Sequence, residues 1–129
     1  MFAKLPIALL AFAAFTVPAP LTAGVPVHLT GNSAADDTLQ KDILQTITHY
    51  GAAFNCPAPS NVRANMLNSS MVPPSLRKPS LRASYEEWDA IFCGKTYRFF
   101  VTFWPDPQGG SFLSVTHPYP PGAPTSVFP

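Results

Sequence analysis

Between residues 33 and 54, apolar side chains recur at the spacing of one face of an α-helix. They follow one another at intervals of four, four, three and four positions: Leu39, Ile43, Ile47, Tyr50 and Phe54. Polar residues occupy the positions between them, so the segment predicts an amphipathic helix with one buried stripe. Ser33 is the predicted N-cap, and Asp36 and Asp37 would place negative charge at the positive end of the helix dipole. Gly51 is expected to end or loosen the helix, and Pro57 with Pro59 must end it.

The segment 84–117 has the alternating pattern of antiparallel strands. The sequence Cys93-Gly94-Lys95-Thr96 suits a two-residue hairpin turn with glycine at the first central position. The cross-strand pairs that this turn predicts are Phe92 with Tyr97, Ala90 with Phe99, Trp88 with Val101 and Glu86 with Phe103. One face of the hairpin is then almost wholly apolar and the other mostly polar, and a slip by one residue would mix the two sets.

The other segments give shorter or weaker patterns. A second turn over 105–110 and a third strand over 111–117 would complete a meander, with either Leu113 and Val115 or Phe112 pointing inward, depending on the loop. Residues 24–31 fit a short edge strand or a tether, and residues 60–70 a short helical turn. Residues 71–80 predict a surface loop rich in proline, serine and basic residues. The proline-rich tail, 118–129, is expected to be extended or disordered.

Together these patterns predict an α+β domain, with one N-terminal amphipathic helix packed on a three-stranded antiparallel meander. A disulfide between Cys56 and Cys93 would join the end of the helix to the first hairpin. A redox thiol pair would usually show a C-x-x-C spacing, and a metal site would need more ligands close together. We therefore favour a structural disulfide, and we expect neither a metal nor a cofactor.

The N-terminal residues indicate the cellular compartment of this domain. Lys4, an apolar run over residues 7–17, prolines and then Ala23 are typical of a secretory signal peptide cleaved after Ala23. The apolar run is shorter than the roughly 20 residues that a membrane-spanning helix needs. We expect a single small domain over residues 24–117, followed by the tail, in the periplasm or outside the cell and without a membrane span after cleavage.

Charge excludes one class of partner. Removal of Lys4 from the eight basic residues leaves seven, which equals the seven acidic residues, so the processed chain has no formal net charge. No basic stripe is evident that would bind nucleic acid, and no cluster of lysine or arginine that would hold an anionic membrane. We therefore expect no nucleic-acid partner.

No catalytic constellation is evident in the sequence. The only dense carboxylates are Glu86, Glu87 and Asp89. Neighbouring residues of a strand point to opposite faces, so Glu86 and Glu87 cannot act as a pair, and the carboxylates beside Arg98 favour a surface ion pair. The three histidines lie far apart, without the spacing of metal ligands. We predict no catalytic residue.

A candidate contact face is formed by Arg98, Phe100 and Trp104, which share the otherwise polar face of the hairpin. Exposed aromatic and arginine side chains are typical of binding hot spots. The alternative is that the proline-rich tail folds back and covers them. The contact face and the covering tail are compatible if the tail can be displaced from these side chains.

The block from Glu87 to Lys95, followed by Gly109-Gly110-Ser-Phe, resembles a pattern in small, uncharacterised exported bacterial proteins. In these a Glu-Trp strand runs into a Cys-Gly turn, an aromatic strand and a Gly-Gly turn. The resemblance covers about a quarter of the chain, and it departs at Ser111, where the family usually shows threonine. It implies a periplasmic or secreted location and no activity. The sequence thus predicts a non-catalytic accessory, inhibitor or immunity-type module that binds another envelope or secreted protein; the alternatives are an envelope hydrolase and a purely structural component.

Overall fold

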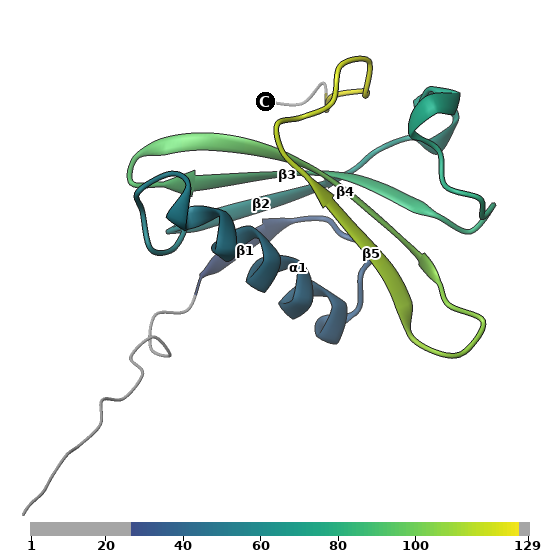
Figure 1. Cartoon of the computed structure of the whole chain (residues 1–129), viewed down its shortest axis with the longest axis horizontal. Coiled ribbons are helices and arrows are strands. Elements are labelled where there is room, and N and C mark those ends of the chain that lie inside the picture. Colours follow the sequence, from purple (N-terminus) through teal and green to yellow (C-terminus); the bar gives the residue numbers. More distant parts are fainter. Residues whose placement is uncertain (1–26, 127–129) are drawn as a thin grey trace, which may run out of the picture.

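The chain folds as one helix and a five-stranded mixed sheet, in a computed structural model that describes residues 27–126 (Figure 1). The main elements are β1 (His28–Gly31), α1 (Asp37–His49), β2 (Asn61–Met66), β3 (Ser84–Phe92), β4 (Lys95–Pro105) and β5 (Ser111–Thr116). The strand order is β1-β2-β3-β4-β5, with β1 parallel to β2 and the other neighbours antiparallel. None of the helices in this part of the chain is long and apolar enough to cross a membrane. The predicted signal peptide, residues 1–23, lies outside the described residues.

The predicted three-stranded meander is wrong, because two further strands extend the sheet beyond β3. Residues 61–66 form β2 instead of the expected helical turn, and Val62 and Ala64 are its two buried side chains. Six residues are too few to separate a helical from a strand pattern, and pairing with the long strand β3 decides the outcome. Of the two alternatives for residues 24–31, the edge strand is confirmed over residues 28–31, and α1 connects it to its parallel neighbour β2.

The predicted amphipathic helix is confirmed, but its N-cap is not Ser33. Asp36 caps the helix by accepting a hydrogen bond from the backbone N–H of Leu39 (2.8 Å). Ile43 and Ile47 are fully buried against the sheet, as the predicted stripe requires. A 3₁₀ turn, η2 (Tyr50–Ala52), ends the helix.

The β3–β4 hairpin keeps the predicted faces but not the predicted register. Cys93 and Gly94 are the two central turn residues, both with positive φ (48° and 84°), so Phe92 pairs with Lys95 and Trp88 with Phe99. This is the pattern of a type I′ turn, in which glycine stands second instead of first. The register differs from the prediction by two residues, and an even shift leaves every side chain on its predicted face.

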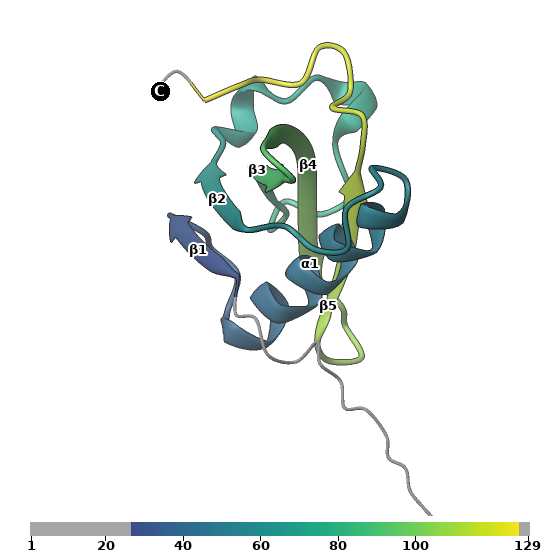
Figure 2. The same cartoon turned by 90° about the vertical axis from the view of Figure 1, so that its left-hand side faces the viewer.

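The molecule has three layers, with α1 on the inner face of the sheet and irregular segments on the outer face (Figure 2). The inner core contains these buried side chains from the sheet: Val62, Ala64, Trp88, Ala90, Phe92, Phe99, Val101 and Phe103. Leu113 and Val115 of β5 also pack inward, whereas Phe112 is exposed. The predicted disulfide is confirmed, and Cys93 reaches Cys56 from the hairpin turn at the end of the sheet.

Two segments cover part of the outer face. The first is the 67–83 loop, which contains the 3₁₀ turns η3 (Ser69–Met71) and η4 (Pro74–Leu76). The second, residues 117–126, we call the C-terminal strap; it crosses the sheet on the side opposite α1 (Figures 1 and 2). Together they enclose a smaller core of Val72, Tyr85 and Phe100, to which the strap contributes Tyr119 and Ala123.

Removal of the disulfide should lower the free energy of unfolding by as much as about 4 kcal/mol, since its partners lie 37 residues apart in the chain. Urea unfolding of the oxidised protein and of a Cys56→Ala/Cys93→Ala variant measures the difference. Reductant should shift the wild type to the midpoint of the variant and leave the variant unchanged. Equal midpoints for the oxidised wild type and the variant would contradict the expected stabilisation.

Candidate contact site

Two adjacent carboxylates of the central strand β3, Glu86 and Glu87, are both buried. Because successive strand residues point to opposite faces, Glu86 lies on the inner face with Trp88, and Glu87 on the outer face with Asp89. A buried carboxylate is costly unless donors satisfy its oxygens. Each of the two accepts at least one hydrogen bond from a segment outside the sheet, and that bond ties the segment to β3.

Glu86 accepts three hydrogen bonds on the inner face. The hydroxyl of Ser33 and the indole N–H of Trp88 donate to Oε1 (2.7 and 2.8 Å), and the backbone N–H of Ala34 donates to Oε2 (2.7 Å). Ser33 therefore binds β3 instead of capping the helix. These contacts fasten the turn that leads into α1 to the central strand, and they position the helix on the sheet.

Glu87 is the corresponding anchor on the outer face, with only 1% of its surface exposed. The backbone N–H of Ser126 donates to Oε1 (2.6 Å), and Nε of Arg98 lies 3.2 Å from Oε2. Glu87 thus fastens the far end of the C-terminal strap. The sequence predicts its face correctly, but not its burial, because the covering strap shows no periodic pattern.

Arg98 joins the buried carboxylate to the surface. Its Nε and Nη2 donate to the two carboxylate oxygens of Asp89 (2.8 and 3.3 Å), which lies directly opposite on β3. The hydrogen bond with Asp89 raises the pKa of Arg98 and outweighs the opposing effect of burial, and the charge of Glu87 adds to it. The side chain remains 42% exposed, so it is held in place and still accessible to a partner.

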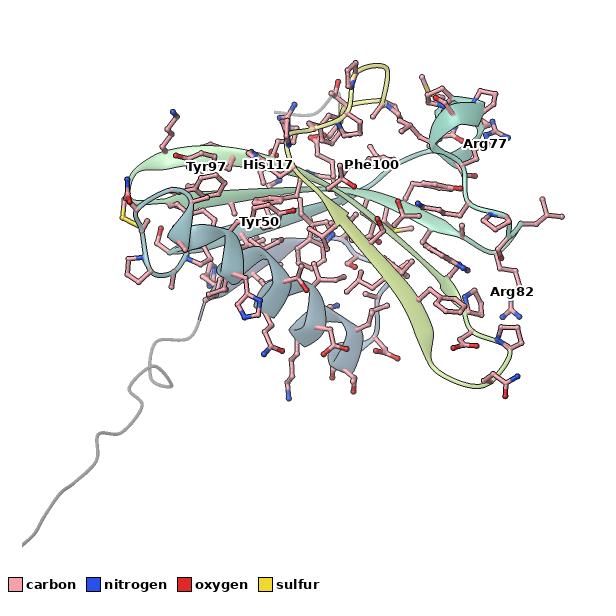
Figure 3. The ribbon with its side chains drawn as sticks, in the orientation of Figure 1. Tyr50, Arg77, Arg82, Tyr97, Phe100 and His117 are labelled. Atoms are coloured by element: carbon pink, nitrogen blue, oxygen red, sulfur yellow. A yellow bond between two sulfur atoms is a disulfide. The ribbon has the colours of Figure 1, made fainter. Side chains whose placement is uncertain are left out.

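Phe100, the second residue of the predicted contact face, lies beneath the strap. Only 3% of it is exposed, and the ring of Tyr119 packs edge-on against it at 5.7 Å. Tyr119 donates its hydroxyl hydrogen to the carbonyl of Pro124, within the strap. The tail therefore folds back over this part of the face, which is the covering alternative considered from the sequence. Figure 3 shows Phe100 between the sheet and the strap.

The strap begins within an aromatic cluster. The ring of His117 contacts four others at centroid distances of 5.1 to 5.9 Å: Tyr50, Phe54, Tyr97 and Phe99 (Figure 3). Burial among these rings lowers the pKa of His117. Its packing anchors the start of the strap, as Glu87 anchors its end.

Trp104, the third predicted residue, is half-buried near the end of β4. Nζ of Lys78 lies 5.4 Å from the centre of its ring, and Phe112 packs beside it at 5.5 Å. The three predicted residues therefore have different surroundings, with Arg98 exposed, Phe100 covered and Trp104 in contact with the 67–83 loop.

The open part of the outer face contains a charged row that crosses three strands. Arg63 of β2 pairs with Asp89 of β3, and Asp89 pairs with Arg98 of β4, so the charges alternate in sign. Next to this row is a shallow depression of about 310 Å³, lined in part by Thr30, Ile91 and Thr96. Sequence reasoning missed Arg63 because it did not predict β2. The alternation of Val62 and Ala64 with polar residues is the signal that could have found it.

Glu86→Gln should destabilise the protein by about 2 kcal/mol, because one N–H donor would then face the amide nitrogen of glutamine instead of an oxygen. Urea unfolding measures the loss, and hydrogen exchange at the amide of Ala34 should become faster. The matched control is Asp42→Asn, which makes the same charge change at an exposed helical position and should cost less than about 0.5 kcal/mol. Equal effects of the two substitutions would show that Glu86 is not an anchor.

Tyr119 should keep its proton at a pH where ordinary tyrosines, with a pKa of about 10, ionise. Burial, and then the charge of Glu87, raise its pKa, so the stability gained from the neutral phenol persists below about pH 10 and is lost as the pH rises toward the folded-state value. Absorbance at 295 nm should show a delayed titration phase while far-UV circular dichroism reports intact structure. Tyr119→Phe should remove that phase. A wild-type titration without it would show that Tyr119 is not buried against the sheet.

Within residues 27–126, no group of three or more histidine, cysteine, aspartate or glutamate side chains is arranged to hold a metal ion. Comparison with known proteins found no match, whether to a family model, to a curated protein or to a solved structure. The uncovered part of the outer face combines exposed charge at Arg98 with apolar surface at Ile91.

Proposed function

We propose that this chain is a small exported protein that binds another envelope or secreted protein without catalysis, as an accessory, inhibitor or immunity-type module. The observation that carries the proposal is the charged row Arg63, Asp89 and Arg98 on the uncovered part of the outer face. The helix covers the inner face, and the strap and the 67–83 loop cover part of the outer face. The row lies on an uncovered part of the central sheet that a partner can reach.

The chemistry of the row supports protein recognition. Alternating charges favour a partner with the complementary pattern and disfavour others through like-charge contacts. The two hydrogen bonds between Arg98 and Asp89 fix the arginine before a partner arrives, which reduces the entropy lost on binding. Apolar surface at Ile91 lines the adjacent depression and provides area to bury. Arg98 keeps the contact role predicted for it, whereas Phe100 would support the face from below and contact a partner only if the strap is displaced.

Export is supported by two independent features. The Cys56–Cys93 disulfide is typical of proteins that fold in an oxidising compartment. The charged and apolar pattern of residues 1–23 is typical of a signal peptide. We therefore propose a periplasmic or secreted location, where the partner would also be found.

Charge reversal in the row should abolish partner binding. We expect the processed, oxidised protein to capture one stoichiometric partner from its own envelope extract, and Arg63→Glu to reduce its recovery at least tenfold. Lys41→Glu is the matched control, because it makes the same charge change on the exposed side of α1 and should retain the partner. Arg63→Glu places a second carboxylate opposite Asp89 and should lower the stability by up to about 1 kcal/mol, so both variants are assayed well below their melting temperatures.

Hydrogen exchange of the purified complex completes this test. The proposal requires slower exchange in β2, β3 and β4 around the row. Equal recovery of the partner by Arg63→Glu and the wild type would exclude the row as the contact. Capture of nothing by any of the proteins would contradict the binding proposal and direct attention to hydrolysis of envelope polymers.

A further inference from the structure

The end of the molecule formed by the 67–83 loop and the start of β5 gathers the exposed apolar side chains. Among residues 27–126, the large hydrophobic side chains that are exposed are Met66, Met71, Leu81 and Phe112. The first three lie in or next to the 67–83 loop, and Leu81 is fully exposed (106%). Such a cluster of exposed apolar side chains indicates a surface that contacts another molecule or a membrane.

The same end carries three positively charged side chains. Arg77, Lys78 and Arg82 lie within six residues of one another, and no acidic residue occurs between Asp42 and Glu86 in the sequence. Glu86 is buried and hydrogen-bonded to other groups, so it does not neutralise them at the surface. Figure 3 shows Arg77 and Arg82 at the end of the molecule that lies away from the disulfide.

The carboxylate at the β4–β5 turn is Asp106, and it accepts a hydrogen bond from the backbone N–H of Gln108 (2.8 Å). One negative charge near three positive charges leaves the cluster cationic. The sequence analysis expected no basic cluster because the processed chain has no net charge, yet three basic residues lie close together in and beside the basic-rich segment 71–80. The burial of Glu86 removes from the surface the acidic residue that follows them most closely in the sequence.

Contacts join the basic and apolar groups into one surface. Arg77, Lys78 and Leu81 line the same depression, of about 280 Å³. Lys78 lies over the ring of Trp104, and Trp104 packs beside Phe112. Arg77 is held by hydrogen bonds to the carbonyls of Val72 (2.8 Å) and Ser70 (3.2 Å), so its position is fixed by the loop.

From this arrangement we propose that this end of the protein docks on an anionic phospholipid surface. Leu81 and Phe112 enter the boundary between headgroups and acyl chains, where apolar side chains gain by leaving water. Arg77, Lys78 and Arg82 face the lipid phosphates, and Trp104 lies at the depth that tryptophan prefers in membrane interfaces. A soluble phosphate would use only the cations and leave Leu81 in water, so the exposed apolar groups favour a lipid surface. The docking end shares no residue with the charged row.

Vesicle co-sedimentation tests this proposal with the processed, oxidised protein. The protein should bind vesicles of phosphatidylcholine and phosphatidylglycerol, and bind pure phosphatidylcholine vesicles far more weakly. Leu81→Ser should lower the partition coefficient about tenfold, and Leu81→Phe should retain it. Arg82→Gln should lower it about fivefold, since each cation near an anionic surface contributes about that factor. The control Lys41→Gln, on the exposed side of α1, should bind like the wild type.

Three outcomes would overturn the proposal. The first is equal binding to both kinds of vesicle, and the second is equal binding by Leu81→Ser and the wild type. The third is displacement by inorganic phosphate beyond that caused by sodium chloride at the same ionic strength, which would indicate a phosphate pocket. Arg63→Glu should still bind anionic vesicles, and Leu81→Ser should still capture the protein partner. Failure of this proposal can therefore be distinguished from failure of the proposed function.

Discussion

The structure depends on two neighbouring carboxylates that are buried on opposite faces of one central strand. Glu86 binds the turn before α1, and Glu87 binds the end of the C-terminal strap through the N–H of Ser126. Neither carboxylate could remain buried without these donors, since an unsatisfied buried charge costs far more than one hydrogen bond returns. Both covering segments are therefore tied to β3, although they lie 52 and 39 residues from their anchors along the chain.

The two ends of the sheet are stabilised differently. At the β3–β4 turn, the disulfide from Cys93 and the aromatic cluster around Phe54 close the core. At the other end, the 67–83 loop is held by a few hydrogen bonds from Arg77 and by the packing of Val72. That end can present Leu81 to solvent because no core side chain depends on it. The covalent cross-link thus lies at one end of the sheet, and Leu81 is exposed at the other.

The sequence predicted those elements whose pattern of apolar and polar residues extends over many positions of a single segment. The helical stripe through Leu39, Ile43 and Ile47 and the faces of the two long strands were correct, since each depends on side-chain periodicity within one element. The helix ends at His49, so Tyr50 and Phe54, the last two residues of the predicted stripe, pack on the core from outside α1. Errors arose where a distant contact decides the structure. Ser33 has the sequence position of an N-cap, but its hydroxyl donates to Glu86. Residues 61–66 form a strand because they pair with the neighbouring strand β3. For the same reason the sequence placed Arg98 among the candidate contact residues and missed Arg63, whose position requires β2.

Arg98 links the buried and the exposed parts of the outer face. Its Nε lies 2.8 Å from Asp89 and 3.2 Å from Glu87, so one guanidinium serves a surface carboxylate and a buried one together. Lysine could not replace it, because a single ammonium lacks the planar fork that reaches both oxygens of Asp89. The burial of Glu87 thus fixes the arginine that a partner would meet. The charged row is pre-organised because the strap is anchored beside it, and its geometry is set by the fold before any contact is made.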